Sequence, residues 1–171
     1  MTPRGPHLRQ LFDLTGRTAM VTGGAQNLGL DMAEALAEAG ADLVITSRLQ
    51  EKAEAAAEEL RSYLPVKILP LGLDVSDEGS VQRAFARVRE EFGRLDVLVA
   101  NAGGARLTGE ASATCKMCVE DWDYVVRVNM RGAFLSCREA LGLMQPARSG
   151  SIIIIASISG MVGRDRSVYE G

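Results

Sequence analysis

Short apolar runs alternate with longer amphipathic segments along most of this sequence, and that alternation constrains the fold more than any other feature. The apolar runs occupy residues 18–22, 42–46, 66–71, 95–100 and 151–156. Runs that are apolar on both faces are typical of strands in a parallel sheet covered on both sides. Helices between successive strands indicate right-handed βαβ units. The sequence therefore predicts an α/β fold, a doubly wound parallel sheet with helices on both faces.

Three of the intervening segments have a helical pattern, over residues 50–63, 77–92 and 120–144. The segment 77–92 is the clearest, because its apolar residues recur at spacings of three and four, and Gly93 is its expected stop. For the segment 120–144, we expect five apolar residues on the buried face. They are Val125, Val128, Phe134, Leu141 and Met144.

Length and composition predict one globular domain. The chain has 171 residues, of which 47% are hydrophobic and 24% charged, values that argue against disorder. We expect residues 1–13 to form a loose leader, without the apolar segment of a secretory signal, and residues 14–171 to form the domain. The longest apolar stretch, 152–156, is too short to span a membrane. A net charge of −3 gives no broad cationic face, so nucleic acid is not an expected partner.

The cysteines do not predict a metal site. Cys115 and Cys118 form a lone CxxC pair, and the only histidine, His7, is about a hundred positions away, whereas zinc sites need four ligands. We expect the thiols to be buried or incidental, and the odd number of cysteines, three, favours a reducing, cytoplasmic location.

A glycine-rich turn follows the first predicted strand. Residues 22–29 read TGGAQNLG and open a helical segment. Glycines allow a tight turn and close approach to a pyrophosphate, and the N-terminal end of the next helix attracts the negative charge. An ordinary strand-to-helix turn is the alternative reading.

This turn resembles the TGxxxGxG motif of the short-chain dehydrogenase/reductase family, with Asn27 in place of the middle glycine. Asn tolerates the left-handed backbone best after Gly, so we expect the turn to be kept. Further segments resemble the family in order, including its NNAG segment at 100–103, where Ala100 replaces the first Asn. The resemblance implies a Rossmann-like NAD(P)-binding domain over 14–171. The cofactor contacts that it implies are Gly23, Gly24, Asn27, Leu28, Gly29, Ser47, Arg48, Asp74, Val75, Asn101, Ala102 and Gly103.

The choice of cofactor depends on the end of the second strand, where an acid would hold the ribose 2′-OH of NAD. Here Ser47 and Arg48 take that position, and a small residue followed by Arg suits the 2′-phosphate of NADP. We expect NADP. NAD is the alternative, for two reasons. In the glycine turn, Gln26 takes the position where the family has a second basic residue, and a lone Arg can be a solvated surface residue.

The resemblance also implies a catalytic set of Asn129, Ser157 and Tyr169. In the family, the tyrosine transfers the proton, the serine holds the substrate oxygen and the asparagine holds a water. The family lysine, four positions after the tyrosine, would fall beyond Gly171, as would the last strands and the substrate lid, so we expect a chain that is incomplete at its C-terminus. Residues 152–155 would then form an uncovered edge, and we expect self-association.

These features favour an NADP-dependent oxidoreductase that interconverts a secondary alcohol and a ketone. A sugar, polyol, sugar acid or ketoacyl compound is the expected small-molecule substrate, and the resemblance implies a homo-oligomer. The alternative is a dinucleotide-binding fragment without catalysis. A serine hydrolase is disfavoured, because Ser157 lacks a GxSxG setting and His7 lies far away in the sequence.

Overall fold

The computed structural model describes residues 11–104 and 116–157. The strands are β1 (Thr18–Val21), β2 (Asp42–Ser47), β3 (Ile68–Gly72), β4 (Val97–Ala100) and β5 (Ser151–Ile154). The helical elements are α2 (Asn27–Glu38), α3 (Gln50–Arg61), α4 (Glu78–Phe92), α5 (Val119–Val125), the π-helical η3 (Val126–Arg131) and α6 (Gly132–Ala147).

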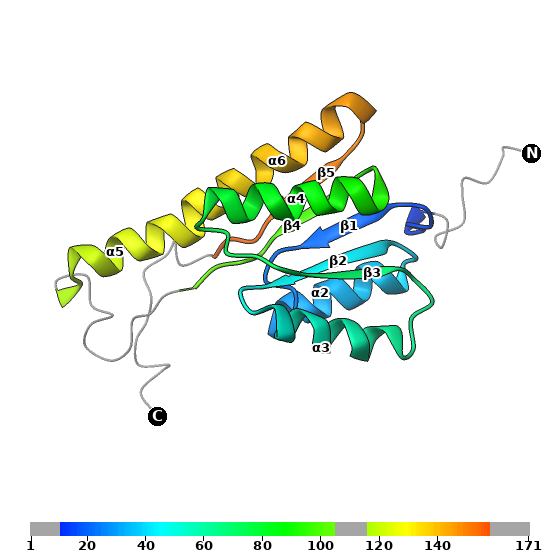
Figure 1. Ribbon diagram of the computed structural model, residues 1–171, viewed down its shortest axis with the longest axis horizontal. Helices are drawn as coiled ribbons and strands as arrows, with labels where there is room; N and C mark the ends of the chain where they lie inside the picture. The colour runs from blue at the N-terminus through cyan, green and yellow to red at the C-terminus, as the bar shows by residue number, and fades with distance from the viewer. Residues whose placement is uncertain (1–10, 105–115, 158–171) are drawn as a thin grey trace, which may run out of the picture.

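The strands form one parallel sheet in the order β3-β2-β1-β4-β5. Helices α2 and α3 cover one face of this sheet, and α4 and α6 cover the other (Figure 1). The predicted doubly wound α/β fold is confirmed. The strand order reverses between β1 and β4, and such a switch point is where open α/β sheets bind their ligands.

Each face of the sheet has its own buried core. On one side, Ala33, Ala56 and Leu60 pack against the sheet, and the small side chains let α2 and α3 approach closely. On the other side, the core is formed by larger residues of α4 and α6, such as Phe85 and Leu135. Because both cores share the buried strands β1 and β4, the carboxyl ends of the strands are held in fixed relative positions.

Helix α4 matches the predicted segment 77–92, and the sequence explains both of its ends. The Asp77 carboxylate accepts hydrogen bonds from the N–H groups of Gly79 and Ser80, so Asp77 is the N-cap rather than the first helical residue. Gly93 ends the helix with a left-handed φ of 70°.

Asp96 connects the first residues of β1 and β4 at the edge of the sheet where these strands begin. Its carboxylate accepts hydrogen bonds from the guanidinium groups of Arg17 and Arg94 and from the backbone N–H of Thr18. Burial by itself raises the pKa of Asp96, but these hydrogen bonds outweigh burial and hold the pKa below its usual value. The charged form of Asp96 therefore stabilises the fold.

The predicted helix 120–144 is wrong in two respects. The segment is divided into α5, η3 and α6, and Phe134 and Leu141, expected to be buried, are 61% and 42% exposed. Small residues occupy much of the buried face instead, including Gly132 and Ala140. A Cβ on Gly132 would lie 2.8 Å from Cγ2 of Val75, so a small residue is what allows α6 to approach this closely. Met144 is buried as expected, but large apolar residues alone do not reveal the small residues of this face.

Strand boundaries differ from the predicted ones by one or two residues at several ends. The strands differ most in burial. Strand β5 lies at the edge of the described sheet, and its residues Ile153 and Ile154 are 46% and 57% exposed. All four residues of β1, by contrast, are buried.

Candidate functional site

A cleft of about 720 Å³ lies at the carboxyl ends of β1, β2, β3 and β4. The loops that follow these four strands line it on one side, and residues of α5 and η3 line it on the other. Figure 1 shows α5 projecting beyond the strand ends at this edge of the sheet. The cleft therefore lies at the switch in strand order, as the general rule for α/β sheets predicts.

The glycine-rich turn forms the floor of the cleft, and its backbone requires the residues that the sequence supplies. Gly23 has a φ of 65°, and Asn27 has the left-handed φ of 49° expected for it. Gly29 packs so tightly that a Cβ would overlap the carbonyl oxygen of Gly23 and lie 2.7 Å from Nδ2 of Asn101. Gly24 is buried behind the turn and does not line the cleft.

Buried hydroxyl groups fix this turn to the neighbouring strands. Oγ1 of Thr22 accepts hydrogen bonds from the backbone N–H groups of Asn101 and Ala102, both at 3.0 Å. Nδ2 of Asn101 donates to the carbonyl oxygens of Thr22 and Gly23, and the N–H of Gly23 donates to Oγ1 of Thr46. Thr22 and Thr46 were not predicted as site residues, although a polar residue at the end of an apolar strand was an available signal.

Helix α2 begins beside the turn with its N-terminus uncapped by a side chain. Gln26 is the N-cap residue, its backbone is extended, and its side chain makes no capping hydrogen bond. The first N–H groups of a helix have no partner within the helix and carry partial positive charge. Together with the glycine turn, this end of α2 can accommodate the oxygens of a diphosphate.

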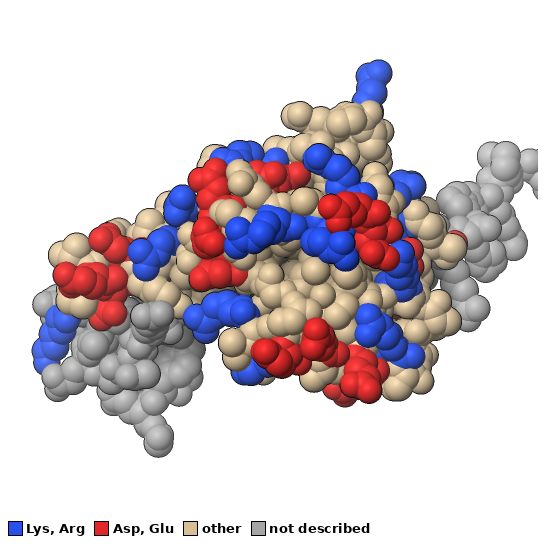
Figure 2. All heavy atoms as spheres, viewed as in Figure 1, with Lys and Arg blue, Asp and Glu red and all other residues tan. Residues whose placement is uncertain are grey.

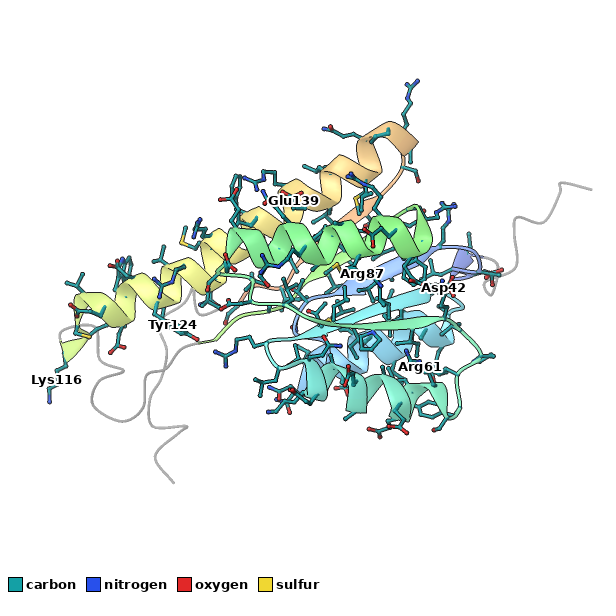
Figure 3. The ribbon with its side chains drawn as sticks, in the orientation of Figure 1. Asp42, Arg61, Arg87, Lys116, Tyr124 and Glu139 are labelled. Atoms are coloured by element: carbon teal, nitrogen blue, oxygen red, sulfur yellow. The ribbon has the colours of Figure 1, made fainter. Side chains whose placement is uncertain are left out.

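The end of β2 and the first turn of α3 form the next part of the wall. Ser47 and Arg48, two of the predicted cofactor contacts, line the cleft, and Lys52 lines it without having been predicted. Nη1 of Arg48 donates a hydrogen bond of 3.4 Å to the hydroxyl of Tyr124, which Figure 3 shows on α5. The contact links the two sides of the cleft.

Asp74 and Val75 lie in the turn that follows β3. Oδ1 of Asp74 accepts hydrogen bonds from the backbone N–H and the hydroxyl of Ser76, at 2.9 and 2.7 Å, and these bonds orient the carboxylate. Val75 is buried against Gly132 of α6, which holds the turn in place. An oriented carboxylate in a cleft can accept a hydrogen bond from an exocyclic amine.

Two of the three predicted catalytic residues, Asn129 and Ser157, lie within the described residues. Asn129, in η3, exchanges two hydrogen bonds of 2.9 Å with the backbone of Gly104 and donates a third to the carbonyl oxygen of Val125. It thereby holds Gly104, four residues after the end of β4, beside the cleft. Ser157 is exposed and follows β5, and Tyr169 lies outside the described residues. The assembly of this catalytic set therefore stays a prediction.

Positive charge is concentrated in the cleft of an otherwise acidic chain. Its charged lining residues are the cations Arg48, Lys52 and Arg127 and the carboxylate Asp74, whereas the whole chain has a net charge of −3. Elsewhere, acidic and basic side chains are interspersed, as on the face drawn in Figure 2. The cleft therefore favours an anionic ligand.

Residues 11–104 and 116–157 offer no candidate for a metal site or for a membrane-spanning helix. No cluster of three potential metal-ligating side chains occurs there, and none of the helices is long and apolar enough to cross a membrane. Cys118 is exposed and Cys137 is half-buried.

Comparison with known proteins gives a consistent result. The sequence model of a family described as short chain dehydrogenase matches residues 17–170. An NADP-dependent mannitol dehydrogenase of Hypocrea jecorina is 37% identical over 164 residues, which cover 94% of this chain and 60% of that protein. A 3-oxoacyl-[acyl-carrier-protein] reductase of Aquifex aeolicus is 34% identical over 88% of this chain and 59% of that protein.

Solved structures show the same likeness. The crystal structure of gox2181 superimposes with a TM-score of 0.82 at 37% identity, covering 90% of this chain and 58% of that one. The chain thus spans about three fifths of the length of the proteins that it matches.

Proposed function

Because this chain belongs to the short-chain dehydrogenase family, we propose that it binds NADP and acts in the interconversion of a secondary alcohol and a ketone. The observation that carries the proposal is the cationic cleft, with a glycine turn on its floor and no acid at the end of β2. The name of the mannitol dehydrogenase relative, which specifies NADP, supports the same cofactor.

Each part of the cleft has a proposed role toward the dinucleotide. Backbone N–H groups around Gly23 and Gly29 would hold the diphosphate, and the absence of a side chain on Gly29 lets the turn pack closely against Gly23 and Asn101. The Asp74 carboxylate would accept a hydrogen bond from the adenine amine. Arg48 and Ser47 would hold the 2′-phosphate through charge-assisted hydrogen bonds.

For the reaction, NADP when bound supplies the hydride acceptor, and its reduced form the hydride donor. We assign the proton transfer at the substrate oxygen to the hydroxyl of Tyr169 and the orientation of that oxygen to Ser157. Asn129 would support the proton relay while it fixes Gly104. A free tyrosine has a pKa of about 10, so nearby positive charge is required for Tyr169 to act as a base at neutral pH.

The substrate that we propose is a polyol, sugar, sugar acid or ketoacyl compound. The names of the mannitol dehydrogenase and 3-oxoacyl reductase relatives support these classes. We also propose a homo-oligomer, because the large apolar residues Trp122, Met130 and Phe134 are 57 to 68% exposed along α5, η3 and α6. The odd number of cysteines supports a reducing, cytoplasmic location.

Two measurements on the chain test the proposal: fluorescence titration with NADPH and NADH, and turnover on a panel of polyols, keto sugars and ketoesters. We expect tighter binding of NADPH and oxidation or reduction of at least one compound. Binding without turnover would select the alternative, a dinucleotide-binding module. Failure of both cofactors to bind would contradict both functions.

The role of Tyr169 has its own test. The substitution Tyr169→Phe removes the proton donor but no proposed cofactor contact, so turnover should fall by roughly a hundredfold or more while NADPH affinity stays nearly unchanged. Turnover that persists in this variant would refute the assigned role.

A further inference from the structure

Lys52 is a cation whose place in the fold is not explained by its neighbours. It lines the cleft from the first turn of α3, and its side chain makes no hydrogen bond or ion pair with any residue in 11–104 or 116–157. Lys67 offers a contrast, since its ammonium pairs with Glu91 at 2.7 Å and lies over the ring of Phe92. Ordinary surface pairing therefore accounts for Lys67 and not for Lys52.

Local helix stability does not account for Lys52 either. The first turn of a helix favours acidic side chains and disfavours cations, because the N-terminal end carries partial positive charge. Glu51 follows this rule, and the next residue, Lys52, opposes it. Residues that break a local rule are expected at functional sites.

The carboxylates nearest to Lys52 in the sequence accept a hydrogen bond from another residue or lie outside the cleft. Glu54 accepts a hydrogen bond of 2.9 Å from Gln50, and neither Glu51 nor Glu54 lines the cleft. Among the described lining residues, Asp74 is the only carboxylate, and it belongs to the turn after β3. Lys52 and Arg48 therefore form a cationic pair on the β2 and α3 side of the cleft, four residues apart in the chain.

We propose that Lys52 is a second cationic ligand of the 2′-phosphate of NADP and that it determines specificity together with Arg48. The assignment rests on the proposed NADP-binding function. A ribose phosphate carries a charge between −1 and −2 at neutral pH, by analogy with phosphorylated side chains, so two cations neutralise it better than one. Arg48 offers five N–H donors and can donate to a phosphate while it keeps its bond to Tyr124. Lys52 supplies the second charge as an ammonium.

Isothermal titration of the whole chain with adenosine 2′,5′-bisphosphate and adenosine 5′-monophosphate tests this assignment, because the two probes differ only in the 2′-phosphate. The substitution Lys52→Gln should weaken bisphosphate binding about 5- to 20-fold and leave monophosphate binding within about twofold. Lys52→Arg should keep the preference. Arg89→Gln, which removes one exposed charge on α4 away from the cleft, is the control for net charge and should change neither affinity.

The outcomes separate this assignment from the function on which it rests. If the unaltered chain binds the two nucleotides equally, both NADP specificity and the role of Lys52 are wrong. If it prefers the bisphosphate and Lys52→Gln keeps that preference, only the role of Lys52 is wrong. An equal loss of affinity for both probes, or the same loss in Arg89→Gln, would also overturn the assignment.

Discussion

Two regions of this molecule are built differently, the region from β1 through β4 and the four residues after it (18–104), and the region from α5 to β5. All residues of β1 are buried, whereas neither α5 nor η3 has a fully buried residue and β5 is largely exposed. The first region contributes almost all of the cleft lining and holds it through hydrogen bonds between strand ends. The second attaches through the pairing of β5 with β4 and through a few small and apolar residues of α6, and it directs large apolar side chains outward. Cofactor binding should therefore depend mainly on the first region.

The largest expected change in stability contrasts two adjacent residues of the second region, one buried and one exposed. Leu135 is 1% exposed in the core, whereas Phe134 is 61% exposed. Leu135→Ala should lower the free energy of unfolding by about 2 to 5 kcal/mol, because it leaves a cavity against the sheet. Phe134→Ala should change it little and should reduce self-association.

Urea unfolding followed by circular dichroism measures the first effect, and sedimentation velocity measures the second. A large loss of stability in Phe134→Ala at a concentration where the chain is monomeric would contradict the division of α6 into a buried and an exposed face. A monodisperse monomer at high concentration would contradict the expected self-association.

The next largest loss of stability should come from a change of Asp96, at the edge of the first region opposite the cleft. Asp96→Asn keeps the shape of the side chain but removes the charge that Arg17, Arg94 and the N–H of Thr18 stabilise. We expect a loss of about 2 to 3 kcal/mol in the free energy of unfolding at neutral pH, the range for hydrogen bonds to a charged group.

This loss should depend on pH. The folded pKa of Asp96 lies below its unfolded value of about 3.9, so the stabilisation is complete well above that value and disappears as the pH falls through the folded pKa. The difference in stability between the unaltered chain and Asp96→Asn should therefore shrink as the pH is lowered from 6 toward 3. A difference that stays constant over this range would show that the charge of Asp96 is not the stabilising feature.

A pair of glycines compares the two regions directly. Gly29→Ala places a methyl group against the carbonyl oxygen of Gly23, so the turn must move and NADPH affinity should fall roughly tenfold or more, the equivalent of one charge-assisted hydrogen bond. Gly142→Ala meets no atom within 4 Å on α6 and should stabilise the chain by up to about 1 kcal/mol with unchanged affinity. Equal NADPH affinities in the two variants would contradict the role of the glycine turn.

The sequence was sufficient for features whose determinants are close together in the chain. Asp77 and Gly93 mark the ends of α4, and the left-handed backbone of Asn27 follows from the preferences of Asn. Long-range features were missed. Hydrogen bonds join Thr22 to Asn101 and Ala102, 79 and 80 positions later, and a polar residue at the end of an apolar strand does not by itself identify such distant partners. The buried face of α6 was predicted only in part: Met144 is buried as expected, whereas Gly132 and Ala140 are too small to signal burial by hydrophobicity.

The most direct test of NADP binding in the cleft is to follow the backbone amide resonances of the isotope-labelled chain while NADP is added. The largest chemical-shift changes should occur at Gly23 and Gly29 on the floor of the cleft and at Arg48 and Asp74 on its walls. Unchanged resonances at these positions, or changes confined to α6 and β5, would contradict the proposed site.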